Sequence, residues 1–591
     1  MTAIHNGNTK SEKPAVRFRA LLLFALCVAL LLMLYDIVDG FNVMSDIDDD
    51  LRAIQIRLLV EGQSWFDRTI PMIQMPEAYV SPWSRLVDMP YAAIAWILTP
   101  ALGIDMAPQA AFWIWPPAML VMLWALLVRT QLLMLDGIAP LRPITLVCCV
   151  LLMMPALHEF VPGRIDHHNV QLLLFMLAFL GLGLWTPFGA VLTGISTVAS
   201  VAVGLELLPL SALLLAAVSL CWMLDRPGSR AFAISLGLSI LASTPLLGLA
   251  LLGPAGLAST QCDAFSAPYA IALAGYGAIT VGLAIAPIRI RVIGRGVLLA
   301  ASGAALMGWL AWRFPLCLEG PYQIIDPLTR SLWFERIEQE KSFLVYYEHG
   351  LIAGLIGLGA FVVILAVAAP IVLKTLKMGR SGTSIIYLSA IAASVLALVQ
   401  IRYLRFAAGF VPLFVPYALI MVARGKSAGR WLLAVVVMVV VIGFGLEALD
   451  PAHSRDIDVA DYLTDAACLY PDFSVLSRVQ PGRILMPPTQ ALHMMVQLPP
   501  RMSVAAVSFH RSAPGMRRVL QVFISPDSES RRKAAEDFDY IAVCRLPIPA
   551  AIADDTLFAV LSRGGGWPGL ERLSGADDAF QLFRIDHTAF R

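Results

Sequence analysis

The chain has 591 residues, of which 58% are hydrophobic and only 14% are charged. Soluble domains carry about 25% charged residues, so this composition excludes an ordinary soluble protein and indicates a chain that is largely surrounded by lipid. The formal net charge of +1, without a dense run of Lys and Arg, excludes the basic surface that nucleic-acid binding requires.

The N-terminal segment, residues 1–19, is polar and basic, and a long apolar run follows it. A signal peptide that is removed would end in a small-residue cleavage site of the A-x-A kind. The sequence after this run has no such site. We therefore interpret the run as a retained first membrane span, with the N-terminus in the cytoplasm.

Many further apolar runs have the length that a helix needs to cross a bilayer. The run 89–104 is short and contains two prolines, so we interpret it as re-entrant or interfacial. Thirteen spans then remain, and this number places nearly all basic loops on the cytoplasmic side, as the positive-inside rule requires. The expected spans are 20–36, 110–128, 143–158, 170–185, 187–204, 207–224, 231–253, 269–286, 297–313, 350–373, 384–400, 406–422 and 431–448.

The same topology assigns two long loops, 36–88 and 314–349, and the C-terminal tail to the outer side of the membrane. The tail is charged, and its short apolar runs "SVAAVSF", "RVLQVF" and "DYIAVC" predict strands, whereas "SRRKAAEDF" predicts a helix. We expect an α-helical polytopic membrane protein with a small extracytoplasmic α/β domain. Its parts are a cytoplasmic N-terminus (1–19), a transmembrane domain (20–448) and the C-terminal domain (449–591).

The eight cysteines fit this topology, because four lie in spans and four on the outer side. The outer side is oxidising, where disulfides form and persist. Two pairs are compatible with the positions, Cys262 with Cys317 in two outer loops and Cys468 with Cys544 in the tail. Their geometry decides whether they are bonded.

An acidic stretch, "SDIDDDLR", begins at Ser45 in the first outer loop. Apolar residues at helical spacing follow it and predict an amphipathic helix over 50–60 that lies on the outer leaflet. Carboxylates at the start of a helix can simply stabilise the helix dipole. Two of them in D-x-D spacing, Asp46 and Asp48, can also bind one divalent cation.

A second polar motif, "GRIDHHN", occupies residues 163–169 at the outer end of a predicted span. It could be an interfacial polar turn. Ionisable groups at the end of a span are costly, however, and they are often functional. Imidazole together with carboxylate suits Mn²⁺ or Zn²⁺ better than Mg²⁺, so Asp166 and His168 are candidate metal ligands.

Two arginines, Arg402 and Arg405, lie on the outer side, against the positive-inside trend. Either side chain could extend to lipid headgroups. A guanidinium can also bind a phosphate through paired hydrogen bonds. Metal-binding carboxylates and a phosphate-binding arginine on one membrane face suggest attack on a sugar that is carried by a lipid phosphate, with metal and arginine stabilising the leaving group.

With these motifs the chain resembles the GT-C glycosyltransferases, and among them the catalytic subunit of oligosaccharyltransferase and a group of related bacterial membrane proteins. The family's first motif is an Asp followed, after five residues, by an Arg, as in Asp46 and Arg52, and "LLVEGQSWFD" follows as expected. Its phosphate-binding Arg stands seven residues before a Pro, as Arg405 does before Pro412. The resemblance covers about residues 20–425 and implies thirteen spans and an outer C-terminal domain.

Three departures from the family matter for function. The second family motif is D-x-E, but here His168 stands in the place of the second carboxylate. The acceptor motif W-W-D-Y-G is absent from the tail, which leaves a glycan, a lipid or a protein as acceptor. The family also implies an acidic residue near the acceptor in the loop 314–349, where "FERIEQEK" offers Glu335, Glu338 and Glu340.

The resulting hypothesis is a glycosyltransferase in the bacterial inner membrane. It would move a sugar or oligosaccharide from a polyprenyl phosphate or pyrophosphate to an acceptor on the periplasmic face, with Mn²⁺ or Mg²⁺ bound. The candidate catalytic residues are Asp46, Asp48, Asp166 and Glu338, the phosphate-binding residues Arg405 and Arg402, and the metal ligands Asp46, Asp48, Asp166 and His168.

A transporter or flippase of lipid-linked saccharides is the alternative. Transporters keep ionisable groups near the membrane midplane, often at broken helices in two related halves, whereas these motifs gather at one face. A structural or sensory protein would leave the three motifs unrelated. The hypotheses differ on whether Asp46, Asp166 and Arg405 meet in one outward-facing cavity.

Overall fold

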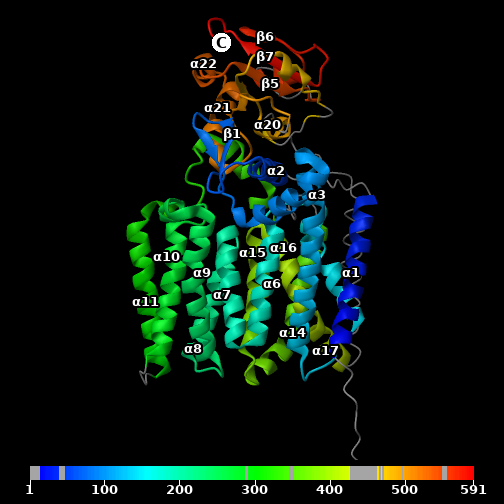
Figure 1. Cartoon of the computed structure of the whole chain (residues 1–591), viewed down its shortest axis with the longest axis vertical. Coiled ribbons are helices and arrows are strands. Elements are labelled where there is room, and N and C mark those ends of the chain that lie inside the picture. Colours follow the sequence, from blue (N-terminus) through cyan, green and yellow to red (C-terminus); the bar gives the residue numbers. More distant parts are fainter. Residues whose placement is uncertain are drawn as a thin grey trace, which may run out of the picture.

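The computed structural model describes residues 14–38, 47–286, 291–344, 352–425, 462–464, 468, 471–495, 497–548 and 556–591. Long helices form a bundle, and a smaller layer of strands and helices covers one end of it (Figure 1). We call these two parts the helix bundle and the outer domain, and we call the end of the bundle that the outer domain covers its outer end.

Several helices of the bundle begin with proline in their first turn, where a missing N–H has no partner to lose. The bundle consists of α1 (Pro14–Val38), α3 (Arg85–Leu135), α4 (Pro143–Leu152), α5 (Met154–Leu157), α6 (His168–Leu184), α7 (Pro187–Val203), α8 (Leu208–Met223), α9 (Ser229–Ala258), α10 (Ala267–Ile285), α11 (Val292–Arg313), α14 (Ile352–Lys377), α15 (Ser381–Val399), α16 (Leu404–Phe410) and α17 (Val415–Arg424).

The bundle has the composition of an integral membrane protein. Within the described residues, 7 helices or joined helices are long and apolar enough to cross a membrane, or 8 if α4 and α5, which meet at 72°, form one broken span. Four shorter apolar helices accompany them, and three of these are α6, α7 and α8. The span expected over 431–448 lies outside the described residues, so thirteen spans remain a prediction.

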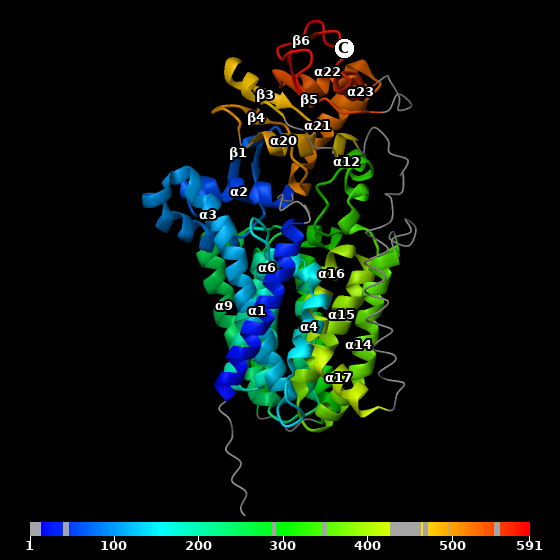
Figure 2. The same ribbon diagram turned by 90° about the vertical axis from the view of Figure 1, so that its right-hand side faces the viewer.

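The run 89–104 forms the first part of α3 and ends at a sharp change of direction. Gly103 has φ 79° and ψ 166°, a backbone conformation that residues with a Cβ rarely adopt. Before this break the helix lies beside α2 (Ile47–Val60) at the outer end of the bundle, and after it the helix descends through the bundle (Figure 2). This arrangement agrees with the interfacial placement that the sequence suggests.

Helix α2 is the amphipathic helix expected over 50–60. Leu51 and Ile54 are buried in the core of the outer domain, while Ile56 and Leu59 pack against the start of α3. Apolar residues on both faces of α2 therefore have protein partners, and its expected position on the outer leaflet stays a prediction.

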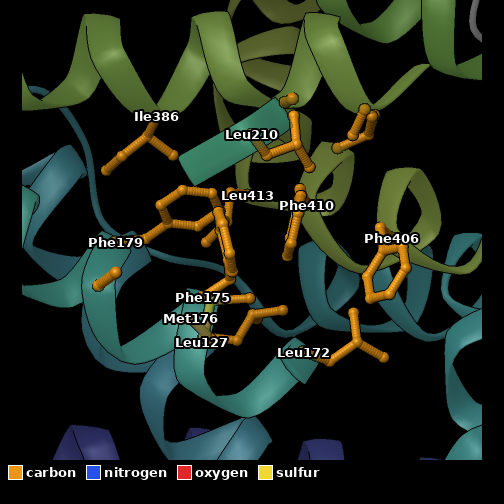
Figure 3. Close-up of a cluster of buried hydrophobic side chains, with 14 of the residues drawn as sticks. Leu127, Leu172, Phe175, Met176, Phe179, Leu210, Ile386, Phe406, Phe410 and Leu413 are labelled. Carbon is orange, nitrogen blue, oxygen red and sulfur yellow. The ribbon is translucent and has the colours of Figure 1, made fainter. Parts of the chain in front are cut away.

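Aromatic side chains hold α6 and α16 together inside the bundle (Figure 3). The Phe410 ring lies 5.7 Å from the Phe175 ring and 4.9 Å from the Phe179 ring, centroid to centroid. Further out along the same helices, the His168 and Phe406 rings are 5.9 Å apart. This packing brings the outer end of α6, with its D-H-H motif, next to the outer end of α16, with its two arginines.

The outer domain contains one sheet to which two distant parts of the chain contribute. The tail supplies five strands, while the loop 36–88 supplies β1 and β2, and β1 pairs in parallel with β4. The α/β character expected for the tail is present, but the first outer loop completes its sheet. In the order β2-β1-β4-β3-β5-β7-β6, the strands are Ala78–Val80, Thr69–Gln74, Ser503–Val504, Arg483–Leu485, Tyr540–Cys544, Phe580–Ile585 and Leu570–Arg572.

The tail helices are α20 (Pro488–Met495), α21 (Ala513–Ile524), α22 (Ser528–Ala535) and α23 (Leu557–Ser562). Helix α22 and strand β5 confirm the predictions for "SRRKAAEDF" and "DYIAVC". The strand predicted for "RVLQVF" is wrong, because these residues form the second half of α21. In "SVAAVSF" only Ser503 and Val504 form a strand.

Both expected cysteine pairs are disulfides in the structure. The Cα atoms are 5.0 Å apart in Cys262–Cys317 and 5.4 Å apart in Cys468–Cys544, distances typical of disulfides. The first bond joins the outer loop after α9 to the outer loop after α11. The four cysteines in the spans are free.

Candidate active site and metal centre

A cavity of about 490 Å³ lies between the helix bundle and the outer domain. We call it the outer cavity. Its lining combines titratable residues from widely separated parts of the chain. These residues are Asp48, His167, Glu206, Asp263, Glu340, Arg402 and His510.

The second motif forms a compact cluster at one wall of this cavity. Asp166 Oδ1 is 2.5 Å from His167 Nδ1, and Asp166 Oδ2 is 3.1 Å from His168 Nε2. All three residues are buried, and each offers one ligand atom such that these atoms lie within 4.8 Å of one another. This spacing is compatible with one bound metal ion.

Glu206 is a fourth member of the cluster, and the sequence analysis missed it. Its Oε2 atom lies 2.9 Å from His168 Nδ1 and 3.3 Å from His167 Nε2. A Cβ at Gly204 would lie 3.2 Å from His167 Cδ2, so glycine allows this turn to approach the cluster closely. The available signal was a single carboxylate in a short outer turn between two apolar spans.

The chemistry of the cluster fits a divalent cation. Asp166 Oδ2, Glu206 Oε2 and His168 Nδ1 are buried, yet within the described residues none makes an aligned hydrogen bond. Buried polar atoms are normally paired, so groups that converge without alignment are suited to a ligand that they share. Mixed imidazole and carboxylate donors suit Mn²⁺ or Zn²⁺.

Electrostatics keep the cluster charged. Burial alone would raise the pKa of Asp166, but His167, His168 and Arg52 hold that pKa well below its usual range. Burial lowers the pKa of His167, whereas the Asp166 and Glu206 carboxylates outweigh this effect and raise it to about 10. The carboxylates are therefore ionised and available as ligands at neutral pH.

Through Asp49, helix α2 positions the loop that carries the D-H-H motif. Asp49 Oδ1 accepts hydrogen bonds from the backbone N–H groups of Ile165 and Asp166, both at 2.8 Å. Its Oδ2 accepts from Arg164 Nη1 at 2.7 Å. The third aspartate of the acidic stretch thus orients the D-H-H motif, a role that the sequence analysis did not assign.

The first motif has one described metal candidate, Asp48, which lines the outer cavity. Asp46 lies outside the described residues. Arg52, which matches the family motif, is buried and ion-paired with Asp88 at 3.1 Å, and its guanidinium lies 4.5 Å above the Trp83 ring. Its Nη2 atom is 4.0 Å from Asp166 Oδ1, so the two motifs are neighbours.

The two candidate phosphate-binding arginines occupy different positions. Arg402 lines the outer cavity and pairs with Glu340 at 2.7 Å and Glu206 at 3.5 Å. Arg405 lies one turn further along and pairs with Glu159 at 2.9 Å, while its Nη2 donates to Gln339 Oε1 at 3.1 Å. Arg405, which matches the family spacing, is thus more enclosed than Arg402.

Glu338 was the acidic loop residue expected near the acceptor, and its neighbour Glu340 is the one that lies at the outer cavity. Glu338 and Glu340 belong to the same short 3-10 helix, Glu338–Glu340. Glu338 is exposed, whereas Glu340 lines the outer cavity.

Comparison with known proteins bears on the fold. No protein-family model and no curated protein matches the chain. Solved structures do match, among them the archaeal oligosaccharyltransferase AglB from Archaeoglobus fulgidus in complex with an inhibitory peptide and a dolichol-phosphate. That match has a TM-score of 0.63 and 12% identity, over 90% of this chain and 70% of that chain.

The chain has the fold of an oligosaccharyltransferase. The apo form of the archaeal enzyme matches with a TM-score of 0.64 and 13% identity, over 89% of this chain and 69% of that chain. Another structure of that enzyme contains Zn and sulfate, and it matches with a TM-score of 0.57 and 12% identity, over 89% of this chain and 68% of that chain.

Proposed function

We propose that the protein is a membrane glycosyltransferase that moves a sugar or oligosaccharide from a polyprenyl phosphate or pyrophosphate to an acceptor in the outer cavity. One observation carries the proposal: His167 and Glu206 of the candidate metal cluster line the same cavity as Arg402, at the outer end of the bundle. In the archaeal enzyme, which shares the fold, one structure contains dolichol-phosphate and another contains Zn and sulfate.

The metal centre uses Asp166, His168 and Glu206, with Asp48 and Asp46 from the first motif, while His167 pairs with the Asp166 and Glu206 carboxylates. The ion is Mn²⁺ or Mg²⁺, and the mixed nitrogen and oxygen donors favour Mn²⁺. A bound divalent ion would neutralise the negative charge that develops on the departing phosphate. Asp49 keeps the D-H-H motif in position through its two backbone hydrogen bonds.

The donor phosphate binds Arg402 and Arg405, whose guanidinium groups can each form paired hydrogen bonds with phosphate oxygens. A fixed cation is worth more in this partly buried site than in bulk water. Asp48, which lines the outer cavity, supplies a carboxylate that can take a proton from the acceptor, whereas Glu338 would reach it only after a movement of its loop. The acceptor is a glycan, a lipid or a protein.

An apolar groove in the bundle has lining residues that are neighbours in sequence of those of the outer cavity, and we assign it to the lipid chain of the donor. It has a volume of about 860 Å³ and is lined by α8, α10 and α11. Its outer end is formed in part by Leu208 and Pro268, which follow the cavity residues Glu206 and Phe265 closely in sequence. A prenyl chain in this groove would bring its phosphate towards Arg402.

The proposal includes a location in the inner membrane of a bacterium, with a cytoplasmic N-terminus and a periplasmic outer domain. The transporter alternative is less favoured because the described charged cluster lies at the outer end of the bundle, not near its middle.

The test measures release of labelled sugar from a polyprenyl-phosphate or pyrophosphate donor by purified full-length protein, before and after chelation and addition of Mn²⁺ or Mg²⁺. We expect release that needs the metal and that falls by about 100-fold or more in Glu206→Gln. Asp225→Asn, at the opposite end of the bundle, is the control and should behave like wild type. Metal-independent release, or full activity of Glu206→Gln, would contradict the proposal.

A further inference from the structure

Three hydrogen-bond donors, two from the segment before α16 and one from the loop after α11, converge on the side chain of Glu340 in the outer cavity. Arg402 Nη2 lies 2.7 Å from Glu340 Oε1, and the Tyr322 hydroxyl donates to the same oxygen at 3.4 Å. Gln400 Nε2 donates to the other oxygen, Oε2, at 3.3 Å. All four side chains line the outer cavity.

This donor set is typical of a site for an oxyanion. A guanidinium, a phenol and an amide can each donate to an oxygen, and the charged donor makes the strongest bond. The carboxylate of Glu340 uses both of its oxygens, as a phosphate would use two of its own. Glu340 therefore occupies a site whose chemistry suits a phosphate group.

Because Glu340 occupies this site beside Arg402, an incoming anion must displace the Glu340 carboxylate before it can bind the guanidinium. Its guanidinium pairs with two carboxylates, because Glu206 Oε1 lies 3.5 Å from its Nη1 atom. Glu206 is also held by His167 and His168. Glu340, in contrast, belongs to a loop. If its carboxylate moved away, the Arg402 guanidinium could bind a new partner.

We propose that Arg402, Tyr322 and Gln400 form the subsite for the donor phosphate, and that Glu340 fills it until the donor displaces its carboxylate. This inference rests on the proposed glycosyltransferase function and deepens it. Glu340 is thus an internal competitor of the donor, which would keep the arginine paired and the cavity closed to other anions between turnovers.

The loop geometry allows the side chain to leave while the backbone stays in place. Two backbone hydrogen bonds fasten the loop to the bundle: Ile401 N–H donates to Lys341 O at 3.0 Å, and Phe343 N–H donates to Leu398 O at 3.1 Å. The Phe343 side chain is only 1% exposed. Rotation of the Glu340 side chain is therefore sufficient to free the subsite.

Competition of this kind lowers the apparent affinity for the donor, because only the fraction of molecules with a free subsite can bind it. Glu340→Gln keeps the size of the side chain but removes its charge and so weakens its pairing with Arg402. We expect this variant to bind a prenyl phosphate about 5-fold more tightly or better than wild type. Glu340→Ala, which removes the competing group altogether, should give at least the same gain.

The experiment titrates purified full-length protein in detergent with farnesyl phosphate by calorimetry, in one Mn²⁺-containing buffer for all variants. Farnesol is the uncharged comparison ligand. Glu319→Gln is the matched control, because it removes the same charge from an exposed position on the same outer loop. It should leave the affinity for farnesyl phosphate unchanged.

A double variant decides whether the gain acts through the subsite. In an Arg402→Gln background, the substitution Glu340→Gln should give no further gain. Unchanged or weaker binding of farnesyl phosphate by Glu340→Gln, or an equal gain in affinity without Arg402, would overturn the inference. The proposed function would stand in that case if the wild-type protein still prefers farnesyl phosphate to farnesol. Equal binding of the two ligands by every variant would overturn both proposals.

Discussion

His167, Glu206, Glu340 and Arg402 of the outer cavity each have at least one partner of opposite charge, and these pairings define what single substitutions should do. Asp166 interacts with two imidazoles and lies near Arg52. Arg402 lies between Glu206 and Glu340. Removing one member therefore changes the charge seen by its neighbours as well as the number of ligand atoms.

Replacement of Asp166 by Asn should weaken metal binding, because it removes an anionic oxygen while it keeps the size of the side chain. Changes around metal ligands cost about 10- to 100-fold in metal affinity, so we expect a loss of about 100-fold. Electron paramagnetic resonance of free Mn²⁺ during a titration measures this without any activity assay. Asp225→Asn should bind Mn²⁺ as wild type does, and equal binding by Asp166→Asn would exclude Asp166 as a ligand.

The two arginines give a direct comparison between family spacing and geometry. Lysine keeps the charge but loses the planar, two-pronged contact with phosphate. Family spacing predicts the larger loss of donor turnover for Arg405→Lys. Because Arg402 lines the outer cavity, we expect Arg402→Lys to lose about 10-fold or more, equal to about 1.4 kcal/mol of transition-state stabilisation. Initial rates with a lipid-linked sugar rank the two variants, and near-normal turnover by Arg402→Lys would contradict its assignment.

Part of the site could be predicted from sequence because its motifs are local. Asp166 and His168 belong to one short motif at a span end, and that position made them candidate ligands, whereas His167 between them was not selected. Glu206 could not be found in this way, because a single carboxylate has no spacing to recognise. The distinction between Glu338 and Glu340 also required the structure, since they belong to a short 3-10 helix in a loop whose sequence has no helical or strand periodicity.

At the scale of elements, the packing of α6 against α16 holds the metal cluster beside the arginines. Phe410→Ala should destabilise the protein, because it leaves a cavity between these helices. Comparable changes in soluble cores cost about 3–5 kcal/mol. We expect about 2 kcal/mol here, since lipid is itself apolar and the loss is mainly one of packing. Thermal unfolding in detergent measures it.

The control for this prediction is Phe188→Ala, at a position where the side chain is 66% exposed. It should change the free energy of unfolding by no more than about 0.5 kcal/mol. If Phe410→Ala were equally harmless, the aromatic contact between α6 and α16 would not hold the site together.

Several elements follow from local pattern, and others do not. Helix α2 and strand β5 were predicted because their periodicity and turn signals are clear. The segment "RVLQVF" is ambiguous, because Val519, Leu520, Val522 and Phe523 fit a strand as well as a helix. The structure resolves it as α21, in which Val519, Leu520, Val522 and Phe523 are all buried in the outer domain. The pairing of β1 with β4 joins residues far apart in sequence, which no local pattern records.

At the scale of the whole molecule, the outer domain is fastened to the bundle beside the outer cavity. Asp263, in the loop closed by the Cys262–Cys317 disulfide, forms paired contacts with Arg511 Nε at 2.5 Å and Nη2 at 2.8 Å. His510 Nε2 lies 2.7 Å from the same carboxylate. Helix α2 makes a second connection, because Asp50 pairs with His493 at 3.2 Å.

Asp263→Asn should loosen this connection, with a loss of about 2 kcal/mol for its charged hydrogen bonds. Burial raises the pKa of Asp263, but Arg511 and His510 outweigh this effect and hold it well below the usual value. The stabilisation is therefore complete above the unfolded pKa of about 3.9 and disappears as the pH falls towards the lower folded value. Thermal unfolding of wild type and variant from pH 7 to pH 3 measures the difference.

The expected difference in stability between wild type and Asp263→Asn is constant from pH 7 to about pH 5 and narrows only below about pH 4. A difference that narrowed already between pH 7 and pH 5 would contradict the lowered pKa of Asp263. No difference at any pH would remove the ion pairs from the account of how the outer domain is held.

The central claim is that the metal ion and the donor phosphate bind in one cavity. Paramagnetic broadening of the phosphorus resonance of farnesyl phosphate by Mn²⁺, measured on the full-length protein, tests it directly because the effect falls steeply with distance. The account predicts strong broadening of the bound ligand with wild type and a large reduction with Asp166→Asn at the same Mn²⁺ concentration. Farnesyl phosphate that binds tightly but is broadened equally in wild type and Asp166→Asn would contradict it.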